Sequence, residues 1–325
     1  MSKEDLSIRE FCIQNNIPDG FQSNRIRAGR NSAVYKISYN KSSWILKHYF
    51  SHSSQSKSRL LTEYHFLEFL SDANISNVAS PIAMDKKNQL ALYTFLPGKI
   101  PSEISLFHID EATDFILKLY SLKDNANAAL IDRAVDSCYT LNEHIDLVDM
   151  RIRELSGSCD HSPEFTEWFN GTLVPTWQNI KSQIAQNDIF EKSEILTISP
   201  SDFGFHNALD CDCRLSFVDF EYAGWDSLSK LACDFICQPE VPISNEQANY
   251  FLEMMAKEIS SPEFNNRIKF LLPLHRIKWC CIMLNVFKST GRLKFAHSGV
   301  VASDILNIQL NKAKSYFLMH LNQFQ

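Results

Sequence analysis

The segment SDFGFHN, residues 201–207, carries side chains whose types and spacing suit phosphate chemistry. Asp202 and Asn207 stand five residues apart, between a predicted strand and a predicted hairpin, and Asp219 follows in the second strand of that hairpin. Phosphoryl transfer needs a carboxylate that accepts the proton of the attacking hydroxyl, and oxygen ligands for a magnesium ion on the phosphates. Asp202 suits the first role, and Asn207 with Asp219 suits the second. Singly, each residue is more simply a turn cap or a surface acid; together they favour a catalytic and magnesium-binding centre.

This segment resembles the catalytic loop and metal-binding strand of the aminoglycoside phosphotransferase and choline kinase-like superfamily. In that superfamily an Asp is followed five residues later by an Asn, and the next hairpin carries Ile or Val, then Asp, Phe or Trp, and Glu. The stretch VDFEYAGWD, which begins at Val218, is close to the second element. The resemblance spans residues 22–240 and implies Asp202 as the catalytic base, Asn207 and Asp219 as magnesium ligands, and ATP with Mg²⁺ as cofactors.

A protein-kinase-like fold also needs a lysine on its third strand to hold the nucleotide phosphates, and a helix glutamate to orient that lysine. Lys47 in WILKHYF and Glu63 in RLLTEYHFL stand at these places, sixteen residues apart. An edge-strand lysine and a solvated helix face are the simpler interpretations of each residue, but their order along the chain favours the functional one. We expect strands at residues 24–28, 33–39, 43–49, 78–84 and 89–95, with a helix at 59–70.

Two further stretches of the amino-terminal region match landmarks of nucleotide binding. RAGRNSAVYKI lies between the first two strands and has a single Gly29, with Asn31 and Ser32 as donors to phosphate. Phe95 and Leu96, followed by Pro-Gly, match the hinge whose backbone groups bind adenine in this superfamily. A turn between domains with no ligand would supply the same hinge residues.

After the hinge the sequence pattern changes from strands to long helices. We expect helices at residues 110–122, 141–155, 163–186, 245–259, 268–287 and 303–322, after a first short helix at 4–15. The sequence therefore predicts an α+β, two-lobed, protein-kinase-like fold. Residues 1–95 would form a nucleotide-binding lobe with a five-stranded antiparallel sheet, and residues 96–325 a larger helical lobe for catalysis and substrate binding.

One departure from the superfamily bears on activity. The usual His-Gly before the catalytic Asp is replaced here by Pro200 and Ser201. The main hypothesis is a small-molecule kinase that transfers the γ-phosphoryl group of Mg-ATP to a hydroxyl. The alternative is a nucleotide-binding pseudokinase with a regulatory or scaffolding role, and a third hypothesis is a kinase acting on protein Ser or Thr. VDFEYAGWD is expected to run directly into a helix, which disfavours an activation segment of the protein-kinase type.

Four residues are weaker candidates for substrate binding. Glu221 could reach the metal or a substrate hydroxyl, and His206 could contact phosphate or merely pack on Phe203. Arg276 and Trp279 lie in the apolar run LLPLHRIKWCCIMLNVF, where a charged residue needs a partner. For Arg276 that partner is an anionic substrate or, more simply, a structural salt bridge. Two acids that follow the metal strand, Asp226 and Asp234, are expected to buttress the next helix.

Composition sets limits on partners and compartment. The chain has 325 residues and a net charge of −6, which disfavours nucleic acid as a partner. Residues 240–325 carry ten Lys and Arg against six Asp and Glu, which leans toward a neutral or anionic acceptor such as a sugar, an amino alcohol or a related metabolite. We expect a cytoplasmic protein, because the start MSKEDLSIREF has no apolar leader and no run suits a membrane helix.

The nine cysteines are expected to be reduced thiols. Cys211 and Cys213 form a close pair that could suggest zinc, but no second Cys or His pair has finger-like spacing. Cys280 and Cys281 fall in an apolar helical pattern and are expected in the core.

Overall fold

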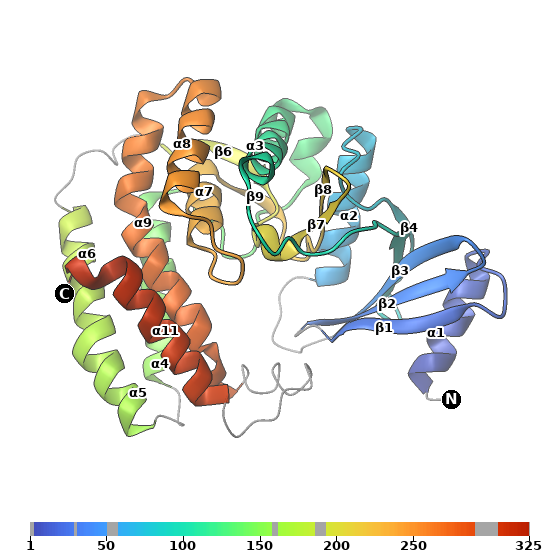
Figure 1. The fold of residues 1–325 in the computed structure, drawn as a ribbon, viewed down its shortest axis with the longest axis horizontal. Helices are drawn as coiled ribbons and strands as arrows, with labels where there is room; N and C mark the ends of the chain where they lie inside the picture. The colour runs from blue at the N-terminus through green and yellow to red at the C-terminus, as the bar shows by residue number, and fades with distance from the viewer. Residues whose placement is uncertain are drawn as a thin grey trace.

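The computed structural model describes residues 3–28, 31–50, 58–157, 162–185, 193–289 and 305–324. Its amino-terminal part is one antiparallel sheet of five strands in the order β1-β2-β3-β5-β4, as predicted (Figure 1). Asn40, with a φ of 52°, makes the tight turn that joins the second strand to the third, a conformation that Asn tolerates better than most residues. The strands are β1 (Gln22–Ala28), β2 (Ser32–Tyr39), β3 (Ser42–Tyr49), β4 (Pro81–Asp85) and β5 (Leu90–Thr94).

Two helices accompany this sheet. α1 (Lys3–Gln14) buries Ile8, Phe11 and Cys12 in a small cluster with strand residues that include Ile37 and Leu46. α2 (Arg59–Asp72) begins at Ser58, whose hydroxyl accepts a hydrogen bond from the Leu61 N–H at 3.4 Å. Its buried face joins the main core of the molecule and includes Leu60, Tyr64 and Leu67. α2 therefore connects the sheet to the larger lobe.

The rest of the chain is mainly helical, so the predicted α+β two-lobed fold is confirmed. One predicted helix, residues 163–186, is divided: α5 and α6 flank a π-helical stretch at Phe169–Leu173. Pro175 lacks the N–H that a regular helix would donate to residue 171, and a π-turn accommodates that loss. The helices are α3 (Leu106–Ser121), α4 (Leu141–Ser156), α5 (Pro163–Trp168), α6 (Val174–Ala185), α7 (Leu228–Cys237), α8 (Asn245–Ile259), α9 (Pro262–Met283) and α11 (Ile305–Leu321).

Helix α9 lies between α11 and α7, side by side with both (Figure 1). The segment Glu263–Phe287 is long and apolar enough to cross a membrane by length and composition alone, contrary to the expectation from the sequence. However, 61% of its most apolar window is buried inside the protein, and its Cys280 and Cys281 are fully buried, as predicted. α9 is therefore the central helix of the second hydrophobic core, which it shares with α4, α5, α6 and α11.

Two small sheets carry the segments around the motif at residues 201–219. β7 (Ala208–Cys211) and β8 (Arg214–Phe217) form the predicted hairpin. Two predictions were wrong in detail. Asp219 lies beyond the end of β8, and a short strand, β9 (Gly224–Ser227), precedes α7 where direct entry into helix was expected. β9 pairs antiparallel with β6 (Leu196–Ser199), so the sequence on either side of the motif is held in one sheet.

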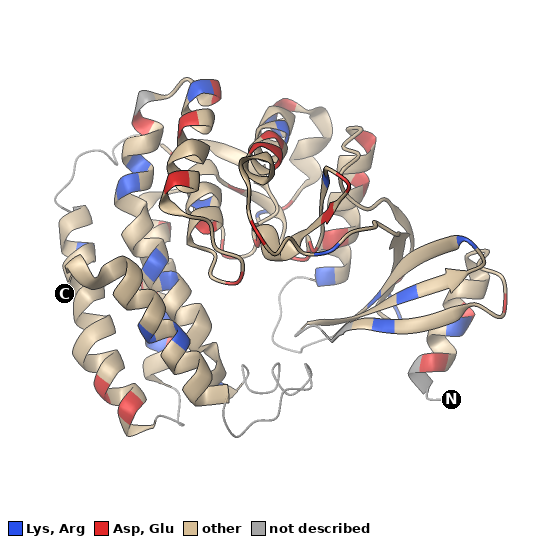
Figure 2. Ribbon diagram, viewed as in Figure 1, with Lys and Arg blue, Asp and Glu red and all other residues tan. Residues whose placement is uncertain are grey.

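Several of the Lys and Arg residues that give residues 240–325 their net positive charge form ion pairs in the structure. Lys and Arg are conspicuous along α9 and α11 (Figure 2), but several are paired with carboxylates from elsewhere. These ion pairs are Arg267 with Glu194 at 2.8 Å, Lys312 with Glu240 at 2.8 Å, and Lys314 with Glu164 at 2.6 Å. These ion pairs neutralise part of the positive charge of residues 240–325 within the fold, so the net charge of this segment is a poor guide to the acceptor.

The described cysteines, eight in number, are free thiols. Cys211 is half-buried and Cys213 exposed, at the β7–β8 turn. Among the described ranges, no group of three or more His, Cys, Asp and Glu side chains could hold a metal ion, so the structure gives no support to zinc at this pair.

Candidate functional site

Lys47 lies at the centre of a cluster of acidic side chains from both lobes. Its ammonium contacts Glu63 Oε1 at 2.7 Å and Oε2 at 2.9 Å, and Asp219 Oδ1 at 2.9 Å. Burial opposes the charge on Lys47, but Asp219 and Glu63 outweigh it and raise the pKa of the ammonium above its usual value. Three residues that the sequence predicted as parts of one site, up to 172 positions apart, are therefore in direct contact.

Glu63 is held firmly by its surroundings. Its Oε2 accepts a hydrogen bond from the Tyr49 hydroxyl at 2.7 Å, and its Oε1 accepts one from the Phe220 N–H at 3.3 Å. The Tyr49 hydroxyl in turn lies 2.8 Å from that of Tyr93. Burial, and then the charge of Glu63, raise the pKa of Tyr49 well above its usual value, so this hydroxyl keeps its proton and remains a donor. Glu63 is thus fixed as a carboxylate that orients Lys47.

The loop between β6 and β7 joins Asp202 to Asn207. The Asn207 amide nitrogen donates to the Asp202 carbonyl at 3.0 Å, and the Asn207 carbonyl accepts from the Val218 N–H at 2.9 Å. These bonds place Asn207 beside the chain that leads to Asp219 and fix the orientation of its amide. The amide oxygen, Oδ1, is buried and has no hydrogen-bond partner within the protein. A buried acceptor without a partner is costly unless a ligand satisfies it.

Asn207 and Asp219 fit a magnesium ion that is carried in by phosphates. The free amide oxygen is one hard oxygen donor, and the Asp219 carboxylate, whose side chain is 31% exposed, is a second that solvent and ligand can reach. Mg²⁺ is commonly held by one or two protein oxygens together with substrate phosphates and waters, so no larger cage is needed. Asp219 has a φ of 73°, a left-handed conformation that most residues avoid and that is frequent at functional turns.

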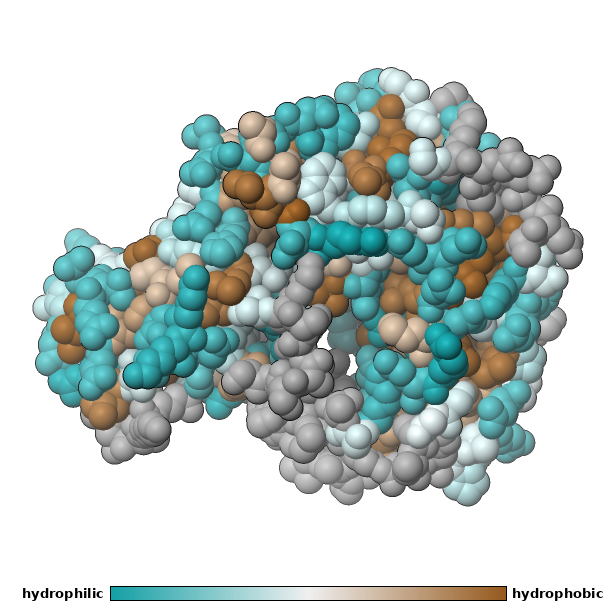
Figure 3. Space-filling view, turned by 180° about the vertical axis from the view of Figure 1, so that it is seen from behind, coloured by the Kyte–Doolittle hydropathy of each residue, from teal (hydrophilic) through white to brown (hydrophobic). Residues whose placement is uncertain are grey.

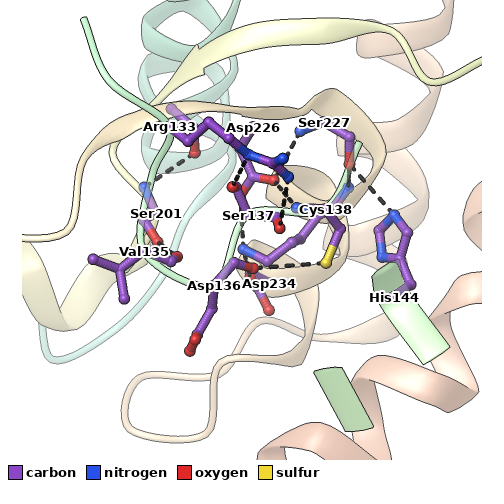
Figure 4. A network of polar contacts seen from close by, with 12 residues as sticks. Arg133, Val135, Asp136, Ser137, Cys138, His144, Ser201, Asp226, Ser227 and Asp234 are labelled. Carbon is purple, nitrogen blue, oxygen red and sulfur yellow. Dashed lines mark hydrogen bonds and ion pairs between the residues drawn. The ribbon is translucent and has the colours of Figure 1, made fainter. Parts of the chain in front are cut away.

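The structure explains how Ser201 takes the place of the expected glycine. Ser201 has a φ of 66°, a conformation that glycine adopts most easily. Its N–H donates to the Ser199 hydroxyl at 3.0 Å, and its own hydroxyl donates to the Val135 carbonyl at 3.2 Å (Figure 4). These two bonds stabilise the turn and connect the catalytic loop to the segment at residues 132–138.

Segment 132–138 runs beside β9 and depends on Gly224. A Cβ atom at Gly224 would lie 2.4 Å from the Asp132 carbonyl oxygen, and the φ of 157° there is one that side chains rarely adopt. Asp226, at the far end of β9, accepts a hydrogen bond from the Cys138 N–H at 2.8 Å (Figure 4). The expectation that Asp226 buttresses the next helix is confirmed, because its other oxygen lies 2.7 Å from Lys230 in α7.

Of the segment predicted to cover phosphate, the described residue Asn31 lies against the residues that follow Asp219. Gly29 is outside the described residues, and Ser32 is buried at the start of β2. The Asn31 amide nitrogen donates to Glu221 Oε1 at 2.7 Å and to the Tyr222 hydroxyl at 2.6 Å. In this structure the Asn31 amide therefore closes the loop onto the larger lobe.

Glu221 is buried, and besides Lys47 it has a second cationic neighbour, Arg59, that no motif in the sequence indicated. Burial, and then the charge of Asp219, raise the pKa of Glu221 to about 8. Its Oε1 lies 3.8 Å from Nε of Arg59, the first residue of α2, which also lies over the Tyr222 ring. Arg59 lies one helical turn before Glu63 and could have been found only by asking which cation faces the buried acid.

The residues predicted to bind adenine lie at the hinge, and two of those predicted to bind substrate lie in α9. Phe95 and Leu96 follow β5 and are half-buried, and the Lys36 ammonium lies 4.2 Å from the Phe95 ring centroid. Arg276 donates to the Tyr316 hydroxyl at 2.8 Å, so its partner is a tyrosine of α11. Trp279 is buried in the second hydrophobic core. No contact joins Arg276 or Trp279 to Asp202 among the interactions of the described residues, and their substrate role stays a prediction.

The two lobes meet around this cluster, and seen from behind the amino-terminal lobe projects to one side of the larger lobe (Figure 3). The hinge glycine, Gly98, has a φ of 129°, and a Cβ atom there would lie 2.8 Å from the Asp210 carbonyl oxygen. Lys99 and Asp210 pair through their backbones at 3.1 and 2.8 Å. The chain that leaves the sheet is thereby attached to the β7–β8 hairpin, directly after the catalytic loop.

Comparisons with known proteins agree with this geometry. Residues 23–133 match the profile of a family described as a phosphotransferase enzyme family, a range that contains Lys47 and Glu63 but ends before Asp202. No curated protein matches the sequence.

The fold itself is similar to those of several solved kinases. A choline kinase from Cryptosporidium parvum aligns with a TM-score of 0.58 and 14% identity, over 98% of this chain and 97% of that one. An ethanolamine kinase from Plasmodium vivax aligns with a TM-score of 0.64 and 11% identity, over 99% and 89%. A spectinomycin phosphotransferase, solved with ADP and spectinomycin, aligns with a TM-score of 0.63 and 11% identity, over 96% and 98%.

The fold is similar to those of these kinases, and residues 23–133 match a phosphotransferase family. The predicted resemblance to the aminoglycoside phosphotransferase and choline kinase-like superfamily is confirmed.

Proposed function

We propose that this protein is a small-molecule kinase that transfers the γ-phosphoryl group of Mg-ATP to a hydroxyl of a sugar, an amino alcohol or a related metabolite. The observation that carries the proposal is the contact of Lys47 with both Glu63 and Asp219, next to a loop that leaves the Asn207 amide oxygen without a partner. A purely structural ion-pair cluster would have no use for that unpaired oxygen.

Each residue has a role that follows from its surroundings. Lys47, held by Glu63, binds phosphate oxygens of the nucleotide, while Asn207 and Asp219 hold the metal. The bound Mg²⁺ supplies charge neutralisation on the phosphates. The Asp202 side chain is 39% exposed, so an incoming hydroxyl can reach it and donate its proton to the carboxylate.

Two observations favour a small acceptor. Only eight residues separate Asp219 from α7, and they form a turn and the short strand β9, which leaves no room for a peptide-binding activation segment. In addition, the similar structures are named as kinases of choline and ethanolamine and as a phosphotransferase of spectinomycin.

The test is turnover of ATP against a broad panel of hydroxyl compounds by the wild type, Asp202→Asn and Asp219→Asn. We expect the wild type to phosphorylate one class of acceptor, and each variant to lose at least about 10²-fold in kcat. Asp212→Asn, at the exposed turn of the β7–β8 hairpin, is the matched control and should keep full activity.

Two outcomes would replace the proposal. Tight binding of Mg-ATP with no transfer by the wild type would indicate the nucleotide-binding pseudokinase, for which Pro200 and Ser201 are the motivating residues. Transfer to Ser or Thr of peptide libraries, with none to small hydroxyl compounds, would indicate a protein kinase.

A further inference from the structure

A histidine inside the catalytic loop contacts the proposed base. His206 Nε2 lies 3.3 Å from Asp202 Oδ1. At this distance an Nε2–H group could donate to the carboxylate, which only accepts. In a neutral ring that carries its proton on Nε2, the other nitrogen, Nδ1, is an acceptor. That Nδ1 is buried and has no hydrogen-bond partner in the described structure.

A second side chain with the opposite need lies beside it. Gln238, directly after α7, is buried, and its Nε2 is a donor without a partner. Its Oε1 accepts from the Glu240 N–H at 2.8 Å and from the Val241 N–H at 3.0 Å. Turning the amide over would break both bonds, so the orientation that leaves Nε2 unpaired is fixed.

Gly204 shows that these two side chains face the same space. A Cβ atom at Gly204 would lie 2.9 Å from Gln238 Cγ and 3.0 Å from His206 Nδ1. Both side chains therefore close over the α-carbon of a residue two positions after Asp202. Gln238 Nε2 is thus an unpaired buried donor on a side chain that lies over the same α-carbon as the unpaired His206 Nδ1. Each of the two atoms costs free energy until it is paired.

We propose that Gln238 and His206 are positioning residues that orient the carboxylate of Asp202, an inference that rests on the proposed function. Gln238 Nε2–H donates to His206 Nδ1, directly or through one water, and so fixes the proton on Nε2. His206 Nε2–H then donates to Asp202 Oδ1, which leaves Oδ2 to accept the proton of the substrate hydroxyl. Catalytic hydrogen bonds that are long in a ligand-free enzyme tighten when the substrate binds.

The central test compares two substitutions of His206. His206→Gln places an amide N–H near the position of Nε2 and should keep kcat within about threefold, because the bond to Asp202 survives. His206→Asn is too short to reach Asp202 and should lower kcat by about 10- to 100-fold with KM for ATP unchanged, the effect of a misplaced catalytic group. His65→Asn, on the exposed face of α2, is the control.

A double-mutant cycle tests whether Gln238 acts on Asp202 through its hydrogen bond to His206 or only through packing. Gln238→Met should lower kcat by about tenfold, and the double variant with His206→Asn should be no worse than His206→Asn alone, because Gln238 acts through His206. Gln247→Met removes a comparable capping amide at the start of α8 and controls for the lost cap. Additive losses, or wild-type kcat in His206→Asn, would overturn the proposal.

A measurement without turnover keeps this inference distinct from the proposed function. In ¹⁵N-histidine NMR spectra, the neutral His206 ring should carry its proton on Nε2 in the wild type, and a larger share of the Nδ1–H form should appear in Gln238→Met. A proton on Nδ1 in the wild type would overturn the relay whether or not an acceptor is found. Absence of any acceptor, with the Nε2–H form observed, would instead count against the kinase reaction alone.

Discussion

The molecule contains two lysine-centred ion clusters that differ in their access to solvent. In the open cluster, Lys47 contacts Glu63 and Asp219, and the Asp219 side chain is 31% exposed. In the closed cluster, Lys230 contacts Asp226 at 2.7 Å and Asp234 at 3.1 Å, and none of these three side chains is more than 5% exposed. Lys278 from α9 also pairs with Asp234.

The difference lies in what the surroundings leave unpaired. In the closed cluster, Asp226 accepts bonds from the Cys138 and Ser227 N–H groups as well as from Lys230. Burial opposes the charge on Lys230, but Asp226 and Asp234 outweigh it and raise its pKa well above the usual value. The open cluster instead adjoins an unpaired amide oxygen on Asn207. The closed cluster also adjoins an unpaired buried atom, His275 Nδ1, but all of its acids are buried. Of the two clusters, the open one alone combines an unpaired acceptor with an exposed acid that a ligand can reach.

The largest expected effect is on folding, and it tests this contrast directly. Lys230→Met removes the cation from a fully buried pair of acids and should lower the free energy of unfolding by about 3–5 kcal/mol. Lys47→Met should cost less, about 2 kcal/mol, because Asp219 can hydrate when its partner is removed. Urea unfolding of both variants gives the comparison.

The effect of the two substitutions on nucleotide binding should be the opposite of their effect on stability: Lys47→Met, the less destabilised variant, should be the one that loses binding. Mg-ATP should raise the melting temperature of the wild type and of Lys230→Met, where that variant folds, but not of Lys47→Met. If both substitutions destabilise the protein equally, and Mg-ATP still raises the melting temperature of Lys47→Met, then both clusters have only a structural role.

A histidine beside the closed cluster predicts a pH dependence. Burial, and then the charge of Lys278, lower the pKa of His275 to about 3, although Asp234 favours the charged ring. His144, whose Nδ1 lies 3.1 Å from His275 Nε2, also lowers the pKa of His275. The ring therefore stays neutral in the fold, while in the unfolded chain it gains a proton as the pH falls below 6.5, the usual pKa of histidine. Stability is thus lost as the pH falls below that value.

His275→Gln removes this proton uptake while keeping a polar group toward His144. Between about pH 6.5 and pH 5 the wild type should lose roughly 1.5 kcal/mol more of its unfolding free energy than the variant does. Urea titrations at four pH values measure the difference in slope. Parallel slopes would mean that His275 is protonated in the fold, and that the closed cluster is not as dry as its burial indicates.

The sequence predicted the open cluster far better than the closed one, for a physical reason. Lys47, Glu63 and Asp219 belong to ordered landmarks around a reaction, so residue type and order along the chain identify them before any contact is known. The partners of Lys230 and Lys278 depend on how α7 packs against α9, which no local pattern encodes. Asp226 and Asp234 could be predicted as buttressing acids, but their cations could not.

Other residues show the same limit. Arg276 was expected to need a carboxylate or an anionic substrate, and the tertiary packing of α11 supplies the Tyr316 hydroxyl instead. Gln238 has no motif at all, and its place beside Gly204 follows from where α7 ends. The sequence predicts Asp219 within the second strand of the hairpin, but β8 ends at Phe217 and Asp219 has a left-handed φ of 73°.

The smallest expected effect concerns Ser201, which connects the catalytic loop to the segment that also contacts the closed cluster. Its φ of 66° costs a non-glycine residue about 1 kcal/mol, and its hydroxyl bond to the Val135 carbonyl returns about the same. Ser201→Gly loses both the cost and the bond, so its stability should lie within about 0.5 kcal/mol of the wild type. Ser201→Ala keeps the cost, loses the bond, and should be about 1 kcal/mol less stable.

This order is the reverse of the usual one, in which glycine destabilises more than alanine because it loses more backbone entropy on folding. Urea unfolding of the two variants is therefore decisive, with Ser199→Ala as a companion that removes the acceptor of the Ser201 N–H. If alanine proved the more stable replacement, the left-handed turn at Ser201 would be wrong. If both matched the wild type, the bond to Val135 would contribute nothing, and the catalytic loop would be independent of the closed cluster on this side.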